Sequence, residues 1–388
     1  MKKRLFHKGA VFSLCLIMLF SMTGCQILGT EMVDLLIIQG IGIDKSKNGY
    51  KVTVEAINNP KNSFLSGNST SESVAKIYVS YGVSIAEALD NVVRVSGKKP
   101  LYSHNRILII GQETVKDGIT SILDFFIREY NAKSAVYIAI AKNMTAEKII
   151  STDMGKDIIV SQVLESVLKD SNENGKAFRM RLFELVNSTL DQTKALYIPY
   201  VVLDEDEKEE ENALTLHGTA VFSKKNDLIG YLSETETLGA MLLNDQMKKG
   251  IININMDGER IVVLRIESTK TKTKVYYENG RVHAEINISM LCNIKEINST
   301  KINNISEEVL KQIKKLAGER IISISASAIN AARNELRADI FSLGRRLWIT
   351  DSAAFGLVKD NWTDAFCNSD IEVTAKVTIK RTGEEAIF

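Results

Sequence analysis

The chain has 388 residues, with 49 basic and 48 acidic side chains and a formal net charge of +1. This balance excludes the strongly basic surface that nucleic-acid binding requires. With 45% hydrophobic and 25% charged residues, the composition is that of a folded protein and excludes a disordered chain. A chain of this length predicts two or three domains.

The first 24 residues have the pattern of a secretory leader. Basic residues up to Lys8 precede an apolar run over 10–20, which is shorter than the roughly 20 residues that a membrane-spanning helix needs. Residues 22–25 (Met-Thr-Gly-Cys) then resemble the bacterial lipobox, in which the cysteine thiol is alkylated by diacylglycerol and the chain is cut before it. We therefore expect a signal peptide over 1–24 and a lipid anchor on Cys25. A leader followed by an unrelated cysteine is the alternative.

The mature chain keeps few cysteines. Removal of residues 1–24 takes away Cys15 and four positive charges, which leaves 364 residues with a formal net charge of −3. Because Cys25 is expected to carry lipid, only Cys292 and Cys367 stay available, and a disulfide scaffold is excluded. Cys292 lies in an apolar strand pattern and is interpreted as a small buried residue. A bridge between Cys292 and Cys367 is the alternative.

Strands and helices alternate through the N-terminal half. A buried strand over 35–38, a turn at 47–49 and an alternating strand over 50–56 predict a hairpin. Residues 58–73, rich in Asn, Ser and Gly, predict a loop. Beyond it we expect strands at 77–79, 106–110, 135–141 and 197–203, a helix capped by Ser84, and helices at 119–128, 157–169 and 178–190. Such alternation is typical of mixed sheets covered by helices.

An acidic run separates the two halves. Residues 204–212 are mostly Asp and Glu, which repel one another and cannot pack, so we expect a solvated linker and a domain boundary here. A cation site is the alternative. The run lacks the glycine-turned loop with ligands at alternate positions that calcium sites use.

The C-terminal half has the pattern of antiparallel hairpins followed by a long helix. The elements expected are strands at 216–222 and 228–232, a helix at 234–247, and strands at 251–255, 260–266, 274–277 and 281–292, the last two joined by a tight turn at 278–280. A helix capped by Ser306 should run on to Ala332, with Gly318 as the point where it can be interrupted. Residues 371–379 alternate as a half-buried strand.

These elements predict an α+β protein of three domains after the cleaved leader. The domains are expected at 25–203, 213–258 and 259–388, with the acidic linker at 204–212 after the first. Each domain should contain a mixed or antiparallel sheet flanked by helices.

No stretch has the pattern of a catalytic site. The sequence contains no Walker loop, dinucleotide fingerprint, HExxH or nucleophile elbow. Residues 40–42 (Gly-Ile-Gly) are too short for a phosphate loop and predict a close approach of a strand to its neighbours. Asp339 and Glu335 lie one helical turn apart, as many solvated acids do. The histidines of the mature chain are far apart in sequence and are interpreted as structural or surface residues: His104, His217 and His283. We expect no enzyme activity, no metal and no cofactor.

Short blocks of characteristic sequence run through nearly the whole chain. They lie at 31–35, 40–45, 49–54, 101–104, 109–111, 123–128, 218–222, 230–232, 236–239, 338–341, 360–362 and 379–383. In their order and spacing these blocks resemble the Ger(x)C family, the lipoprotein C subunits of spore nutrient-germinant receptors. Two departures are visible: residues 26–30 (Gln-Ile-Leu-Gly-Thr) replace the family's Trp-Asp-Arg-Arg run, and Leu238 stands where arginine is common.

The resemblance implies a non-catalytic subunit held by diacylglycerol and an N-acyl chain of the palmitate type on Cys25. It implies a location on the outer face of the cell membrane, which in the spore is the inner membrane. The implied partners are the integral-membrane A and B subunits and the lipid bilayer, and the implied role is in nutrient-triggered germination. The sequence identifies neither the germinant, nor any germinant-binding residue, nor the docking surface.

Two other functions are consistent with a lipid-anchored chain. A solute-binding lipoprotein of a membrane transporter would have two lobes with a polar cleft at the hinge. The second half argues against it, because hairpin signals dominate there and no doubly wound strand-helix repeat is present. A secreted hydrolase would need a nucleophile motif, which the sequence lacks.

Overall fold

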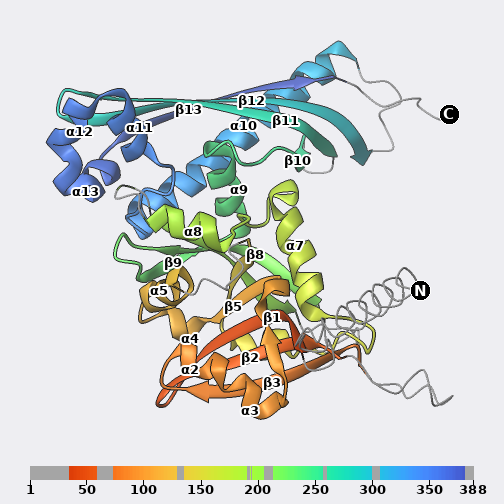
Figure 1. The fold of residues 1–388 in the computed structure, drawn as a ribbon. Coiled ribbons are helices and arrows are strands. Elements are labelled where there is room, and N and C mark those ends of the chain that lie inside the picture. Colours follow the sequence, from red (N-terminus) through yellow and green to blue (C-terminus); the bar gives the residue numbers. More distant parts are fainter. Residues whose placement is uncertain are drawn as a thin grey trace, which may run out of the picture.

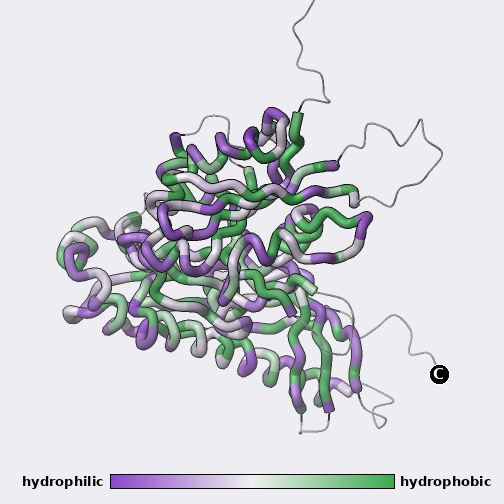
Figure 2. The backbone as a smooth tube through the Cα atoms, turned by 90° about the horizontal axis from the view of Figure 1, so that it is seen from below, coloured by the Kyte–Doolittle hydropathy of each residue, from purple (hydrophilic) through white to green (hydrophobic). Residues whose placement is uncertain are grey.

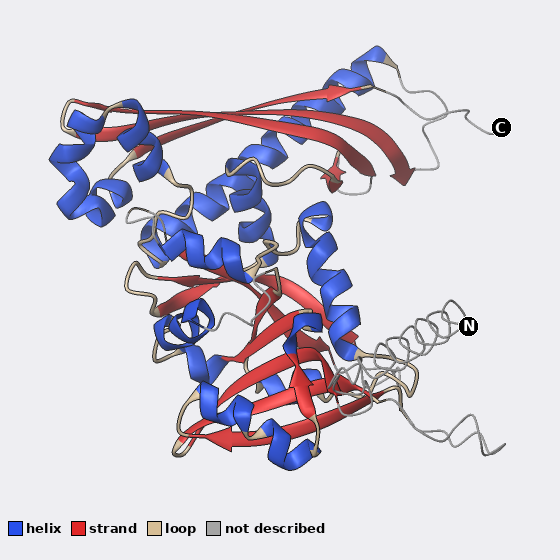
Figure 3. Cartoon of the chain, in the orientation of Figure 1, coloured by secondary structure: helices blue, strands red, loops and turns tan. Residues whose placement is uncertain are grey.

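The computed structural model of the protein describes residues 35–58, 73–128, 135–189, 193, 195–204, 213–256, 260–298 and 306–380. The predicted signal peptide, Cys25, and most of the predicted loop and acidic linker lie outside these residues. The described part contains two β-sheets with helices packed on both, which confirms the α+β class (Figures 1 and 3).

The first sheet has nine strands and is mixed. Its order is β3-β2-β1-β5-β6-β7-β8-β9, with β4 paired to β1 beside this path. The central strands β1, β5, β6 and β7 are parallel, and the pairs on either side are antiparallel. The strands are β1 (Leu35–Ser46), β2 (Gly49–Ile57), β3 (Ala75–Gly82), β4 (Lys99–Leu101), β5 (Ile107–Gly111), β6 (Tyr137–Ala141), β7 (Leu196–Asp204), β8 (Ala213–Phe222) and β9 (Leu228–Leu232).

The parallel strands of this sheet are buried on both faces, which explains their continuous apolar runs. In β5, Ile107 and Ile109 face a core under α6 (Ala146–Ile150) and α7 (Val160–Asn174), whereas Leu108 and Ile110 face the opposite core. The other helices of this part are α2 (Ile85–Asp90), α3 (Val92–Ser96), η2 (Tyr102–His104), α4 (Gln112–Val115), α5 (Thr120–Arg128) and α8 (Leu182–Thr189). Ser84 caps α2, as predicted.

The second sheet has four strands in the order β10-β11-β12-β13. All pairs are antiparallel except β12–β13, because the chain crosses through helices before it returns as β13. Its strands are β10 (Gly250–Asn255), β11 (Ile261–Glu278), β12 (Arg281–Asn298) and β13 (Asp370–Ile379). Its helices are α9 (Glu234–Leu243), α10 (Glu307–Asn330), the π-helix η3 (Ala331–Glu335), α11 (Leu343–Thr350), α12 (Ser352–Val358), η4 (Lys359–Asn361) and α13 (Trp362–Cys367).

The two sheets lie at opposite ends of the molecule, with α8, α9 and α10 between them (Figure 1). The helix α9 follows the first sheet along the chain and packs against α10 of the second part. Seen from below, the helices alternate between purple and green along their length, as expected for elements that bury one face (Figure 2).

Three of the differences between the structure and the sequence-based expectation affect the architecture. First, the predicted middle hairpin does not form a sheet of its own: β8 pairs with β7, with Asp204 opposite Ala213, so the hairpin extends the first sheet. The described residues therefore form two sheets and not three. The division into domains at 204–212 and after residue 258 stays a prediction.

The other two differences concern element boundaries. The strands predicted at 260–266 and 274–277 are one 18-residue strand, β11, with a register shift between Ile266 and Ser268. The long helix α10 continues through Gly318 without interruption. The tight turn after β11 is confirmed, since Asn279 and Gly280 have φ of 50° and 79°, the left-handed values that such a hairpin turn requires.

Candidate functional site

The two cysteines among the described residues are both free thiols. Cys292 is buried in β12 and Cys367 is half-buried at the end of α13. Burial raises the pKa of Cys292 to about 12, so its thiol is poorly reactive. The interpretation of Cys292 as a small buried residue is confirmed. Cys25, the predicted lipidation site, lies outside the described residues.

Two buried carboxylates fasten helices onto the first sheet. Asp44, on β1, accepts hydrogen bonds from the backbone N–H groups of Ala146 (2.7 Å) and Glu147 (2.9 Å) at the start of α6. Glu55, on β2, does the same for Val160 (2.8 Å) and Ser161 (2.7 Å) at the start of α7. Burial raises the pKa of both carboxyls, and the N–H donors oppose that shift. At α7, whose N-cap residue Ile159 makes no side-chain hydrogen bond, Glu55 takes the place of a local cap, whereas at α6 Asp44 adds to the local cap by Thr145.

The glycines of the Gly-Ile-Gly stretch allow α7 and α6 to pack closely on β1. A Cβ atom added to Gly40 would lie 1.9 Å from Ser161 Oγ, at the N-terminus of α7. A Cβ at Gly42 would come within 2.9 Å of Ile150 Cδ1 in α6. The prediction that this stretch allows close approach is therefore confirmed, and the neighbours are helices.

A third buried carboxylate, Asp339, organises the helices at one end of the second sheet. Its oxygens accept hydrogen bonds from the backbone N–H groups of Phe341 (3.0 Å), Leu343 (3.2 Å) and Gly344 (2.9 Å), and from the indole N–H of Trp362 (3.2 Å). From its spacing to Glu335, Asp339 was interpreted as one of many solvated acids. This interpretation was wrong, because Asp339 is only 4% exposed. It lies just before α11, whose own first residues have no side-chain cap.

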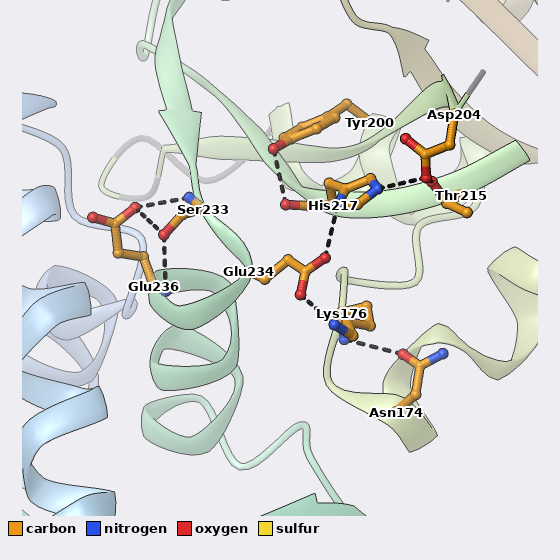
Figure 4. A network of polar contacts seen from close by, with 9 residues as sticks. All are labelled: Asn174, Lys176, Tyr200, Asp204, Thr215, His217, Ser233, Glu234 and Glu236. Atoms are coloured by element: carbon orange, nitrogen blue, oxygen red, sulfur yellow. Dashed lines mark hydrogen bonds and ion pairs between the residues drawn. The ribbon is translucent and has the colours of Figure 1, made fainter. Parts of the chain in front are cut away.

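The candidate functional site is a polar network at the junction between the first sheet and the helices of the second part (Figure 4). We call it the junction network and define it by Lys176, Asp204, Thr215, His217 and Glu234. His217 lies on β8 and points between two acids. Its Nε2 is 3.0 Å from Asp204 Oδ2, and its Nδ1 is 2.8 Å from Glu234 Oε1.

Each acid of the network has a second partner. Thr215 donates its hydroxyl to Asp204 at 2.5 Å, and the Lys176 ammonium forms an ion pair with Glu234. Together the hydroxyl of Thr215 and the imidazole of His217 hold the pKa of the Asp204 carboxyl below its ordinary value. Because both ring nitrogens of His217 face carboxylate oxygens, both contacts are hydrogen bonds only when both nitrogens carry a proton.

Aromatic residues support the network from the sheet. The Tyr200 hydroxyl donates to the backbone carbonyl of His217 at 2.8 Å. The ammonium of Lys142 lies 4.2 Å from the ring centre of Tyr200 and 4.6 Å from that of Tyr231. Burial lowers the pKa of Lys142 and raises that of Tyr231 to about 12. These groups fix the strand position from which His217 reaches Asp204 and Glu234.

The junction network joins three segments that are far apart in sequence. Asp204 ends β7, Glu234 begins α9, and Lys176 follows α7, so His217 ties the sheet edge to the helix that carries the second part. Its side chain is 41% exposed, which leaves the network open to solvent. The arrangement is an ionic clamp that links β7, β8, α9 and the segment after α7.

The other histidines are not part of this clamp. His104 is exposed in η2, and His283 stacks on Tyr276 with ring centres 5.2 Å apart. Across the residues that the structure describes, no group of three or more His, Cys, Asp or Glu side chains is arranged to hold a metal ion. Of the helices in the described ranges, none is long and apolar enough to cross a membrane.

Comparison with known proteins identifies the family. Residues 29–203 match the family model described as the spore germination protein N-terminal domain, and residues 217–383 match the spore germination B3/GerAC-like C-terminal domain. The chain is 24% identical over 315 residues to spore germination protein GerQC of Bacillus cereus, a match that covers 80% of this chain and 84% of that protein. It is 23% identical over 372 residues to spore germination protein KC of Bacillus subtilis (strain 168), with 91% of each chain covered.

A solved structure shares the fold. The crystal structure of the GerBC protein superposes with a TM-score of 0.59 at 18% identity, covering 88% of this chain and 96% of that chain. The two family models together cover most of the chain, and the interval between them contains the acidic run. The chain therefore belongs to the GerAC-like family of spore germination proteins and has a role in germination.

Proposed function

We propose that the protein is the lipid-anchored, non-catalytic C subunit of a spore germinant receptor, needed for germination in response to a nutrient. Membership of the family over almost the whole chain is the observation that carries this proposal. The expected partners are the integral-membrane A and B subunits.

The anchor proposed is Cys25, which would carry diacylglycerol and an N-acyl chain on the outer face of the spore inner membrane. The first family match starts at residue 29, directly after the lipobox-like residues 22–25. Several acyl chains on one residue hold a protein stably at a bilayer. Tethering also raises the effective concentration of the folded part near membrane partners, so that weak contacts suffice.

A non-catalytic role is supported by how the protein uses its buried acids. Asp44, Glu55 and Asp339 each accept hydrogen bonds from backbone N–H groups at helix starts. The polar groups of the junction network are committed to one another. The chemistry of the described residues is thus that of a scaffold.

The composition of the complex is tested by affinity purification of the tagged protein from detergent-solubilised spore membranes, followed by mass spectrometry. We expect two multi-span germination subunits to copurify. Recovery of a transporter permease in their place would instead support the solute-binding function.

The anchor is tested by Cys25→Ala, with Cys367→Ala as the matched control. We expect labelling by an azido-palmitate analogue and normal germination in the control, and loss of both in Cys25→Ala, while urea unfolding of the purified chain is unchanged. A Cys25→Ala protein that still takes up label and supports full germination would contradict the anchor.

A further inference from the structure

The fold determines where the chain leaves toward the proposed anchor. β1 and β4 are parallel, with Leu35 opposite Lys99 and Leu36 opposite Pro100. In a parallel pair the two strands begin at the same end, so the described part of β1 begins, at Leu35, beside Lys99 and the end of α3. Cys25 is ten residues before Leu35, a span of at most about 35 Å when fully extended.

The surface at this exit point is both basic and apolar. We call it the anchor-side surface and define it by Val93, Arg94, Val95, Lys98 and Lys99. Val93 and Val95 are 44% and 50% exposed on α3, although valine side chains are usually buried. Arg94 and Lys99 are exposed and Lys98 is half-buried.

Among the described residues, the three cations of this surface have no ion-pair partner. Asp90 is the one acidic residue between positions 90 and 99, so the segment has a net charge of +2. Basic side chains around exposed aliphatic groups are the combination that binds the interface of an anionic bilayer.

We propose that the anchor-side surface rests on the anionic lipid around the anchor and forms a second, reversible membrane contact. The proposal builds on the proposed lipid anchor, because Leu35 lies beside this surface and is only ten residues after Cys25. The exposed apolar residues of α11 and α12 lie at the far end of the second sheet, away from α3 (Figure 1). A second contact would fix the orientation of the subunit, which attachment at a single residue cannot do.

The test measures vesicle binding without the lipid anchor. The protein is the mature chain from residue 25 with Cys25→Ala, which keeps every described element and the acidic tether residues Glu31 and Asp34. Binding to vesicles of phosphatidylcholine with 30% phosphatidylglycerol is measured by cosedimentation at low salt, with pure phosphatidylcholine vesicles as reference. The test variant combines Arg94→Gln, Lys98→Gln and Lys99→Gln.

The control variant removes the same charge from a remote face. It combines Lys270→Gln, Lys272→Gln and Lys376→Gln, three exposed lysines of the four-stranded sheet. Each basic residue near an anionic lipid surface strengthens binding by about five-fold, so the test variant should bind more than 100-fold more weakly. The control should bind as the parent chain does, and none of the three should bind pure phosphatidylcholine.

The results separate this inference from the lipid anchor. If both variants lose vesicle binding equally, or if the parent chain does not bind anionic vesicles, the anchor-side contact is overturned even if Cys25 is lipidated. Conversely, selective loss in the test variant would support the contact even if azido-palmitate labelling showed no lipid on Cys25. A parent chain with Val95→Cys and Cys367→Ala, labelled at position 95 with a polarity-sensitive dye, should show a blue shift on anionic vesicles, and an unshifted spectrum would also contradict the contact.

Discussion

Two buried helical glycines of this protein should differ in their response to the same substitution. Gly239 lies in α9 where it crosses α10, and Gly318 lies in α10 against β13. A Cβ atom at Gly239 would lie 2.3 Å from the backbone oxygen of Ile324 and 2.9 Å from Ala328 Cβ. A Cβ at Gly318 would meet only the backbone oxygen of Ala375, at 3.4 Å, which is an ordinary contact.

The magnitude follows from two opposing effects. Replacing glycine by alanine inside a helix stabilises it by about 1 kcal/mol, and this gain is common to both sites. At Gly239 the added methyl group meets backbone atoms that cannot move without separating the helices, and such overpacking costs about 1–3 kcal/mol. We therefore expect Gly318→Ala to be more stable than the parent chain, and Gly239→Ala to be less stable than Gly318→Ala by about 1–3 kcal/mol.

The assay is urea unfolding followed by tryptophan fluorescence. The chain has two tryptophans, Trp348 and Trp362, and both lie in helices of the second part, which α10 supports. With a denaturant slope of roughly 2 kcal/mol per molar urea, the midpoints of the two variants should differ by about 0.5–1.5 M. Coincident midpoints for Gly239→Ala and Gly318→Ala would refute the close packing of α9 on α10.

Three further predictions concern single side chains. Asp339→Asn should lower the free energy of unfolding by about 2–4 kcal/mol, because one amide oxygen cannot accept from all four donors. The exposed control Glu335→Gln should change this free energy by less than about 0.5 kcal/mol. Equal effects of the two substitutions would contradict the role of Asp339 in holding these helices. The fold lowers the pKa of the Asp204 carboxyl below its ordinary value of 3.8. The contribution of Asp204 to the stability of the folded protein is therefore present at pH values above 3.8 and is lost as the pH falls further. The stability difference between the parent and Asp204→Asn should thus be below about 1 kcal/mol at pH 7 and vanish on acidification, and a difference that grows in acid would show the sign to be wrong. Iodoacetamide at pH 8 should modify Cys367 before Cys292 in the folded protein, as read by mass spectrometry, and the reverse order would show that Cys292 is accessible.

Local patterns in the sequence predict most of the individual elements. The hairpin of β1 and β2, the cap at Ser84, the turn at Asn279-Gly280 and the start of α10 at Ser306 all depend on residues close together in the chain. Each was predicted with the correct type. Their signals are local spacing and side-chain chemistry, which act before any tertiary contact forms.

Elements shaped by distant contacts were predicted less well. The middle of β11 has no apolar alternation, so it was expected to separate two strands. In the fold its polar residues face the end of α9 and not an apolar layer: Thr271 donates its hydroxyl to Leu242 O at 2.7 Å, and its N–H to Asp245 Oδ1 at 2.9 Å. Hydrogen bonding to another element replaces hydrophobic burial there, and no periodicity in the sequence encodes it.

The junction network and Asp339 were missed for the same reason. Asp204, His217 and Glu234 are separated in sequence and come together only through the pairing of β7 with β8 and the turn into α9. Asp339 accepts hydrogen bonds from backbone groups that follow it in the chain and from Trp362, which lies beyond α11, α12 and η4. The family blocks at 338–341 and 360–362 contain both partners, so the resemblance marked these positions before their contact was known.

The pairing of Asp204 with Ala213 has a consequence for how the protein responds to proteolysis. The acidic run joins two strands that are already held side by side, so cutting the chain within it removes no hydrogen bond of the β7–β8 ladder. A protease nick there should therefore yield two fragments that elute together from a sizing column and separate only in denaturant. Conversely, the two halves expressed apart would each expose an unpaired strand edge, which favours aggregation. After such a nick, the β7–β8 ladder would hold the two halves of the sequence together as a noncovalent complex.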